Sequence, residues 1–570
     1  MNFNFISRVS RLAAIGAILC GSASCVYVNE ELGENFIPTD QKWDVFTPDP
    51  VELKEIRLQM SDSLSAYSST RLTFGSVTDD VMGTTVKSTS FTLVPIADTL
   101  DFGENPVVRQ FHFNALRDTL STVYDNQIGM IQNVYVSELK RKLDTTVLYT
   151  GTFMNEKARE EFLDLDNRIT AGVPVYAGGD TLSFDFSKEY AQTVISRLQG
   201  MVLDSMATYL DVMPGIYITT DAPVGKGGRI NMFQLPIATD SYGYIDANYA
   251  QLKITSKYGD RENVDTSFLF YFGPTEILEE DDEDFPDQYA FNGSEHDSNS
   301  IYSGEGVVAG ENIYVEGGSG VKPVVKAVEI RRILEEEIGK AGIRDISEVV
   351  INKATIILPY DVNGDYSALD RYPDILTPTV RLRSSSNSEY ITYAGLTDSS
   401  IETENQGDIN RSVSMYSPDI SHHVQEILKL DETAEDYEKT LEKYDIWFLI
   451  MHEEVTESSS SSSSYSDYYN NLAYSSYYNN MMYDPYGYGY GYGGYGYGYG
   501  SYGYGSSYYN NYYNYMLMSM YASSYSSSDT STSTELDKDR YYNGVLCGPD
   551  AAGDRRPAIK LTFSAPKTAE

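Results

Sequence analysis

The chain has 570 residues and a formal net charge of -41 at pH 7, from 42 Lys and Arg against 83 Asp and Glu. Such acidity argues against nucleic acid and anionic lipid headgroups as ligands, because both would be repelled. Basic partners or divalent cations suit it better, although acidity also keeps a tethered protein soluble. A chain of this length can bury a sizeable core without disulfides.

The N-terminus has the pattern of a bacterial lipoprotein signal peptide. Arg8 and Arg11 form a basic flank, residues 12–19 are apolar, and a run of small residues leads to Cys25. The apolar stretch is too short to span a bilayer, and the order of these segments is that of a secretory signal. We therefore expect residues 1–24 to be removed and Cys25 to be acylated, so that the mature chain is anchored by lipid.

One residue departs from this pattern. Ser22 stands where leucine is usual, so simple secretion with cleavage near Ser24 is the alternative. Removal of residues 1–24 takes away two arginines and no acid, which changes the net charge from -41 to -43. It also removes Cys20, and acylation of Cys25 leaves Cys547 with no partner for an internal disulfide. No second apolar run approaches the length of about 20 residues that a transmembrane helix needs.

Residues 25–50 are predicted to be a tether, because acidic residues follow Cys25 and three prolines favour extended backbone. From Val51 onward, short runs rich in β-forming residues alternate in polarity and are bounded by turn residues. This spacing predicts a mainly β fold with inserted helices, built from antiparallel, sandwich-like sheets. The predicted strands include 56–60, 71–74, 90–94, 111–113, 215–218, 251–255, 267–272, 354–359, 446–450 and 559–563.

Helices are few and fall between the groups of strands. Residues 156–165 and 328–341 have amphipathic patterns, and 419–444 is expected to hold two short helices. Residues 189–213 carry apolar side chains near helical spacing as far as Pro214, which predicts one long helix.

Composition divides the body into two β-rich halves. The acidic run at 279–284 marks the break, so we expect an N-terminal half at 51–285 and a C-terminal half at 286–570. The second half contains residues 458–534, which have no Lys, Arg, Val, Ile, Phe or Trp and alternate Gly and Tyr at their centre. Too few aliphatic side chains are present to offset the entropy of ordering, so this segment is predicted to be a disordered insertion. Its tyrosines are suited to stacking on sugars or aromatic partners, but a repeat expansion without a dedicated role is equally consistent with them.

The sequence shows no catalytic, cofactor-binding or metal-binding constellation. The five histidines lack the paired spacing of a helical zinc site. Asp361 and Asp365 begin like a calcium loop, but Tyr366 replaces its glycine and Tyr372 its closing acid. The Ser-x-x-Lys spacing at residues 137–140 has no companion motif. We therefore expect no enzymatic activity and no cofactor.

Five motifs in order resemble a family of Bacteroidota lipoproteins whose domain has no known function. They are Phe74-Gly75 with Asp79-Asp80 and Met82 to Thr85; Gly215 to Ile218; Phe291-Asn292 with His296-Asp297; Tyr314 to Gly320; and Asn352-Lys353-Ala354, where Thr355 departs from the acid of the family. The likeness covers roughly Cys25 to Phe563. The glycines of the fourth motif suit a turn that packs one half against the other, and His296-Asp297 suits a hydrogen-bonded pair that holds a loop.

The resemblance implies a large exported lipoprotein of the outer membrane, displayed on the cell surface or facing the periplasm. Glu30 and Glu31, shortly after Cys25, are similar to surface-export signals of such bacteria. The expected function is a non-catalytic binding or scaffold subunit that contacts another envelope protein, such as an accessory of a machine that assembles or exports outer-membrane proteins. The alternative is a surface lipoprotein that binds glycans or adheres to cells through its tyrosines. A hydrolase is a third, minor alternative.

Overall fold

The computed structural model describes parts of the chain between residues 43 and 567. The predicted signal peptide, Cys25 and the tether up to residue 42 lie outside the described residues, as does the acidic run at 279–284. Among the residues described, no helix has both the length and the apolar character needed to cross a membrane. The described ranges are 43–61, 64–67, 69, 71–80, 82–97, 100–118, 122–123, 130–143, 149–239, 245–273, 288–297, 300–302, 306–362, 366–384, 390–400, 405–457, 482–483 and 530–567.

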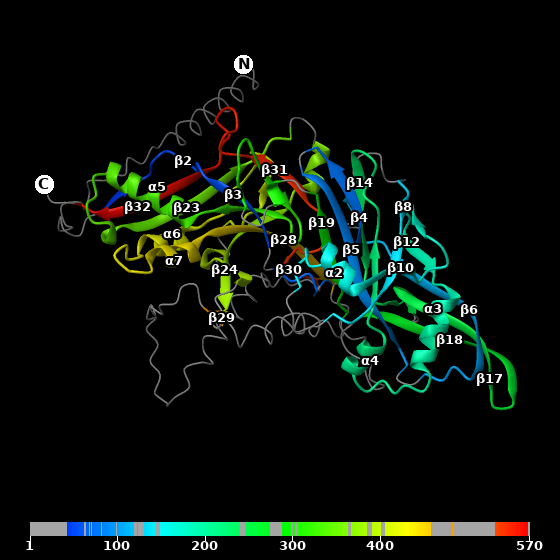
Figure 1. Ribbon diagram of the computed structural model, residues 1–570. Helices are drawn as coiled ribbons and strands as arrows, with labels where there is room; N and C mark the ends of the chain where they lie inside the picture. The colour runs from blue at the N-terminus through cyan, green and yellow to red at the C-terminus, as the bar shows by residue number, and fades with distance from the viewer. Residues whose placement is uncertain are drawn as a thin grey trace, which may run out of the picture.

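The largest sheet is antiparallel and runs in the order β10-β9-β13-β5-β18-β17-β6-β12, with β4, β7, β14 and β19 beside this path. Its longest strands extend toward one end of the molecule, where β17 and β18 form a hairpin (Figure 1). The strands are β4 (Arg71–Asp79), β5 (Gly83–Pro95), β6 (Glu104–Leu116), β7 (Thr122–Val123), β9 (Tyr135–Leu139), β10 (Leu163–Arg168), β12 (Thr181–Asp185), β13 (Ile216–Thr219), β14 (Gly227–Gln234), β17 (Tyr249–Tyr258), β18 (Arg261–Gly273) and β19 (Phe291–His296).

Two further antiparallel sheets occupy the other end of the molecule. One runs β1-β32-β23-β27-β26 with β2 beside β32, and the other runs β20-β3-β22-β28-β24-β25 with β29 and β30 attached. Their strands are β1 (Trp43–Phe46), β2 (Val51–Glu52), β3 (Ile56–Met60), β20 (Val307–Val308), β22 (Val321–Val325), β23 (Val350–Pro359), β24 (Ile375–Ser384), β25 (Tyr390–Gly395), β26 (Ile409–Asn410), β27 (Met415–Tyr416), β28 (Ile446–Glu457), β29 (Met482–Tyr483), β30 (Thr530–Leu536) and β32 (Ala558–Pro566).

Three two-stranded sheets complete the strand inventory of the described residues. They pair β8 (Gln132–Asn133) with β11 (Val175–Tyr176), β15 (Ala238–Thr239) with β16 (Ile245–Ala247), and β21 (Asn312–Glu316) with β31 (Asn543–Cys547). This arrangement confirms the predicted fold class of a mainly β protein with antiparallel sheets and inserted helices.

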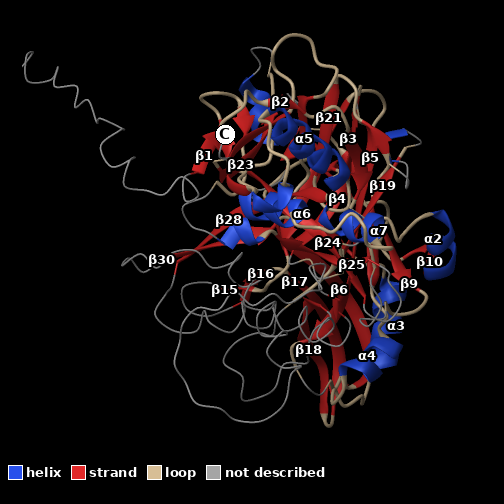
Figure 2. Cartoon of the chain, turned by 90° about the vertical axis from the view of Figure 1, so that its left-hand side faces the viewer, coloured by secondary structure: helices blue, strands red, loops and turns tan. Residues whose placement is uncertain are grey.

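Most helices lie toward the two ends of the molecule, and α2 lies between them (Figure 1). Figure 2 shows α5 and α6 near β23 and β28, whereas α3 and α4 lie at the opposite end. The helices are α2 (Glu156–Phe162), α3 (Lys188–Leu198), α4 (Met206–Val212), α5 (Ala327–Lys340), α6 (Ser421–Leu428) and α7 (Tyr437–Leu441), with short 3-10 turns η3 (Ser300–Tyr302), η4 (Ile346–Glu348), η5 (Tyr366–Arg371), η6 (Thr397–Ser400) and η7 (Glu442–Tyr444).

The predicted helix at 189–213 is two helices. Ser187 caps α3 by accepting from the backbone N–H of Tyr190, and the helix ends before Gly200, whose φ is +72°. A residue in this left-handed conformation cannot continue a right-handed helix, so α4 begins again only at Met206. Apolar side chains recur near helical spacing on both sides of the break because α3 and α4 each bury apolar residues. The helices predicted near 328–341 and within 419–444 are confirmed.

Two large hydrophobic cores follow the sheets. The core of the large sheet is rich in aromatic side chains, such as Phe113, whose ring stacks on Phe184 from the neighbouring strand and on Phe272. The second core is mainly aliphatic and lies between α5, α6 and the strands of the other sheets; Ile330 and Ile427 are fully buried there. Bulky β-formers at alternate positions thus hold each sheet to its own helices.

The sheets divide the chain at places that differ from the predicted half boundaries. Strand β1 lies inside the predicted tether, where it pairs with β32. Strands β2 and β3, at the start of the predicted N-terminal half, pair with β32 and β22 of the other sheets. Strand β19 follows the predicted break, yet it pairs with β5 in the large sheet. These pairings join segments remote in the sequence, which composition does not reveal.

Part of the segment that was predicted to be disordered, 458–534, forms strands. Strand β30 begins at Thr530 and pairs with β28 over seven positions, from Met451↔Leu536 to Glu457↔Thr530. Residues 530–534 were included in the predicted disordered segment because they are all serine and threonine. Strand β28 supplies their backbone partners, and composition does not show such a pairing. Met482 and Tyr483 form β29 beside β24. The remainder of 458–529 lies outside the described residues.

Candidate functional site

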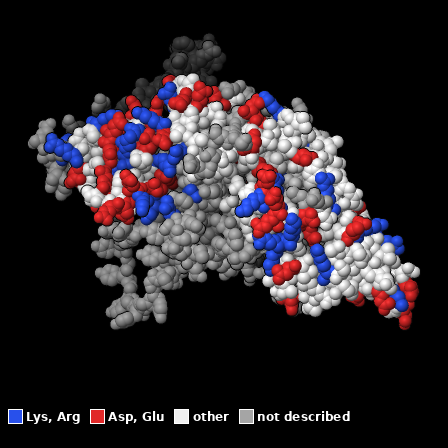
Figure 3. Space-filling view, in the orientation of Figure 1, with Lys and Arg blue, Asp and Glu red and all other residues white. Residues whose placement is uncertain are grey.

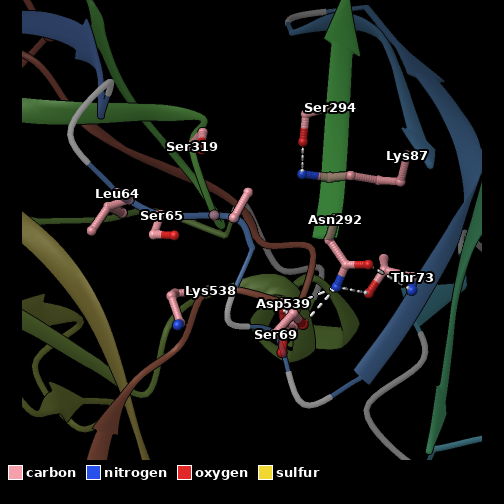
Figure 4. Close-up of a pocket in the computed structure, with 12 residues that line it drawn as sticks. Leu64, Ser65, Ser69, Thr73, Lys87, Asn292, Ser294, Ser319, Lys538 and Asp539 are labelled. Atoms are coloured by element: carbon pink, nitrogen blue, oxygen red, sulfur yellow. Dashed lines mark hydrogen bonds between the residues drawn. The ribbon is translucent and has the colours of Figure 1, made fainter. Parts of the chain in front are cut away.

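A polar buried region lies where the large sheet meets the other sheets. Figure 4 shows Lys87 and Asn292 approaching from β5 and β19 of the large sheet, while Ser319 and Asp539 approach from the chain after β21 and after β30. A small cavity lies between them. It is lined by Leu64, Ser65, Ala66, Ser69, Thr73, Lys87, Asn292, Ser294, Gly318, Ser319, Lys538 and Asp539. We call this region the junction.

A buried ion pair crosses the junction. Glu316, the last residue of β21, is fully buried, and its Oε1 lies 3.0 Å from Nε2 of His296 on β19. The hydroxyl of Thr85 on β5 donates to the same oxygen over 3.2 Å. Burial alone would raise the pKa of Glu316, but the nearby positive groups of His296, Lys87 and Lys322 outweigh it and lower the pKa to about 2. Glu316 is therefore a carboxylate held by two strands of the large sheet.

Two buried lysines surround this carboxylate. Lys322 is 1% exposed, and its ammonium donates to the backbone carbonyls of Gly318 and Gly320 over 2.9 and 3.1 Å and also to that of Glu316. Burial lowers the pKa of Lys322 to about 7, although Glu316 opposes the shift. Burial also lowers the pKa of Lys87, whose ammonium donates to Ser294. Both ammonium groups are thus occupied by protein acceptors, as buried charges require.

The glycine-rich turn between β21 and β22 leaves no room for a side chain at Gly317 or Gly320. A Cβ on Gly317 would stand 2.0 Å from the carbonyl oxygen of Arg540, and one on Gly320 would stand 2.5 Å from the Glu316 carboxylate. Ser319, within the turn, accepts a 2.8 Å hydrogen bond from the backbone N–H of Gly151. The turn therefore packs against the segment after β30 and against the loop before α2, in agreement with the predicted packing role of these glycines.

The segment after β30 completes the junction. Asn292 donates through Nδ2 to Ser69 over 2.7 Å and to Asp539 over 3.1 Å, and Ser69 donates to the same Asp539 carboxylate. Asn292 also accepts from the backbone N–H of Thr73 over 3.2 Å. Asn292 of the Phe291-Asn292 motif thus links β19 to Ser69, to Thr73 and to the segment after β30. Asp297, next to His296, accepts from the backbone N–H of Thr84 over 2.8 Å.

The junction joins the large sheet to the other sheets through buried polar contacts. Its buried charged groups are bonded to protein partners, and its cavity is small and lined mainly by short polar side chains. Among the described residues, no group of three or more His, Cys, Asp and Glu side chains is placed to hold a metal ion. The clustering of one carboxylate, one imidazole and two ammonium groups was not predicted from sequence, because Lys87 lies more than 200 positions before the other three.

Other residues that the sequence singled out lie elsewhere. His422 and His423 donate their backbone N–H groups to Asp398 at the start of α6. The His423 ring is fully buried rather than at the surface, and its Nε2 lies 2.8 Å from the Tyr444 carbonyl oxygen. Burial lowers the pKa of His423 to about 4. Cys25 lies outside the described residues.

Comparison of the chain with protein family models, with curated proteins and with solved structures found no match. The resemblance to a Bacteroidota lipoprotein family therefore stays a prediction from sequence motifs.

Proposed function

We propose that the protein is a lipid-anchored component of the bacterial outer membrane whose β-rich body binds another envelope protein. The observation that carries this proposal is the order of basic flank, short apolar stretch and small residues before Cys25. Strand β1 begins at Trp43, so the chain between Cys25 and the body reaches at most about 60 Å when extended. This reach keeps the body next to the membrane and accessible to envelope proteins.

The junction supports a scaffold role for the body. Its buried ion pair and hydrogen bonds connect strands of the large sheet to the glycine turn and to the segment after β30. A two-ended body that is joined in this way presents its surfaces in a fixed arrangement, as an accessory of an assembly or export machine needs. On the face shown in Figure 3, acidic and basic side chains are interspersed rather than separated, so partner binding there would rely on shape as much as on charge.

The test begins with the mature N-terminus. Mass spectrometry of the membrane-extracted protein should find an acylated Cys25, and Cys25→Ala should release the protein from the membrane fraction. A bare terminus on a soluble protein would overturn the anchor. Affinity purification of the lipidated protein in gentle detergent should then recover a reproducible outer-membrane partner, and recovery of the protein alone would overturn the binding role. Digestion of whole cells with external protease distinguishes surface display from a periplasmic location.

Glycan binding or adhesion is the second candidate. Strands β28 and β30 pair up to Glu457 and Thr530, and the tyrosine-rich residues lie between these two strands in the sequence. Tyrosine side chains are suited to stacking on sugar faces. Glycan-array binding that is lost when residues 458–529 are deleted would support this function. Unchanged adhesion after that deletion would contradict it.

A further inference from the structure

Three polar side chains on the outer face of the large sheet form a connected hydrogen-bonded series. Ser183 and Asp185 lie two residues apart on β12, so both project to the same face, and His112 lies opposite Asp185 on β6. Oδ1 of Asp185 lies 2.8 Å from Nδ1 of His112, and Oγ of Ser183 lies 3.1 Å from Nε2 of the same ring. The order is therefore carboxylate, imidazole, hydroxyl.

The carboxylate fixes the direction of these bonds. An ionised Asp185 only accepts, so Nδ1 of His112 carries the proton, and Nε2 of the neutral ring is left to accept from the Ser183 hydroxyl. Gln110 donates to the same Asp185 oxygen over 3.0 Å and thereby holds the carboxylate in place. A serine whose proton is directed at an oriented neutral imidazole is an activated nucleophile.

The sheet edge adds a donor beside the hydroxyl. Strand β12 ends the path of the large sheet. The backbone of Phe186 donates to Phe111, and Arg117 donates to Asp180, so the even-numbered residues of β12 exchange hydrogen bonds with β6. The N–H of Ser183 therefore points away from β6, toward the side on which residues 169–171 bond to Asp185 and Ser187. It is positioned to donate to an oxyanion that forms when Ser183 attacks a carbonyl carbon.

The neighbouring side chains suggest which ester would be accepted. Asn114 lies opposite Ser183, and Tyr249 lies opposite Asn114 on β17, so an amide and a phenol continue the row across the same face. The half-exposed positions of His112 and Asp185 leave the series open to solvent rather than at the end of an acyl tunnel. This surface suits a small acyl group on a hydroxylated carrier that lies across the strands.

We propose that Ser183, His112 and Asp185 form an acyl-transfer site for esters of small acyl groups on hydroxylated carriers such as acetylated sugars. Ser183 Oγ forms a bond to the acyl carbon while its proton passes to Nε2 of His112. The bond from the acyl carbon to the carrier oxygen breaks, and the imidazolium returns the proton to that oxygen. Water then attacks the acyl-serine, giving the free acid and restoring the hydroxyl. This site goes beyond the proposed binding role and departs from the expectation of no enzymatic activity.

The test uses the full-length protein in detergent, with a fluorophosphonate probe and p-nitrophenyl acetate. Mass spectrometry should place the probe on Ser183, and Ser183→Ala should abolish labelling. His112→Asn and Asp185→Asn should each slow labelling at least tenfold. Thr181→Ala, two residues earlier on the same face of β12, should leave it unchanged.

Hydrolysis should favour p-nitrophenyl acetate over the palmitate ester, and acetylated xylose should release acetate. Circular dichroism confirms that each variant is folded. A folded wild-type protein that takes up no probe would overturn the proposal. So would labelling at another residue, or labelling that persists in Ser183→Ala. Because the binding partner of the anchored protein is measured separately, failure of this site leaves the proposed function standing.

Discussion

Glu316 Oε1 and His296 Nε2 lie 3.0 Å apart, and this ion pair joins β21 to β19 of the large sheet with both side chains almost fully buried. Removing one partner of a buried pair leaves an uncompensated charge in a low-dielectric site. The pair is therefore the point at which the connection between the sheets is most sensitive to substitution.

We expect His296→Ala to lower the free energy of unfolding by about 3–5 kcal/mol, because Glu316 then lacks its imidazole partner. Urea denaturation followed by circular dichroism measures this change. The matched control is Arg411→Ala, which removes an ion pair with Asp374 whose side chains are 56% and 55% exposed. It should cost no more than about 1 kcal/mol. Equal effects of the two substitutions would contradict the role of the junction.

Stability should fall in acid because of Glu316. Its pKa is about 2 in the folded protein against an ordinary value of 4.5, so the unfolded chain binds the proton first as pH falls. The contribution of this carboxylate is fully present above pH 4.5 and is lost between pH 4.5 and 2. Glu316→Gln should flatten that part of the stability curve, as measured by urea midpoints at successive pH values. A wild-type slope that persists in the variant would contradict this assignment.

Lys322 acts in the same direction as Glu316 but at higher pH. Its pKa falls from 10.5 to about 7 in the folded protein, so between these values the unfolded chain binds more protons and stability rises with pH. Lys87, whose pKa is also lowered, adds to the same slope. Lys322→Met should reduce the rise between pH 7 and 9.5 in thermal unfolding midpoints. Lys340→Met, on the exposed side of α5, is the control and should retain the rise.

The glycine turn gives a prediction that depends on steric contact alone. Gly317→Ala places a Cβ 2.0 Å from the Arg540 carbonyl oxygen, so backbone must shift at a cost of about 1–3 kcal/mol. Gly339→Ala, in the helix α5 with nothing within 4 Å of the new Cβ, should instead stabilise by about 0.5–1 kcal/mol. Thermal unfolding of the two variants should therefore shift in opposite directions. A neutral Gly317→Ala would show that the turn does not pack as described.

The hairpin of β28 and β30 predicts that the body folds without residues 458–529, although this deletion also removes β29, a two-residue strand beside β24. Replacing them by Asn-Gly joins Glu457 to Thr530, which already pair, through a two-residue turn. A shorter loop loses less entropy on closure, so the midpoint of thermal unfolding should stay the same or rise. Loss of cooperative unfolding in this variant would show that the insertion contributes to the fold.

Several elements were predictable from local pattern. The alternation in Ile559–Phe563 gave a strand, and the apolar spacing in 328–341 gave a helix, because one buried face requires these periods. The break at Gly200 was not predicted, since the apolar spacing continues on both sides of it. Of the junction, the glycine turn was predictable from composition, whereas its charged partners were not.

The sequence alone determines the lipoprotein-like N-terminus, the β-rich character and the unusual composition of 458–529, because each depends on residues that are neighbours in the chain. Only the tertiary structure decides that Glu316 meets His296, that β3 joins β22, and that Ser183 lies beside His112. Pairing of distant strands is set by which faces bury together and in which register, and many pairings satisfy the same alternation. Contacts that depend on such pairings appear only when the whole chain has folded.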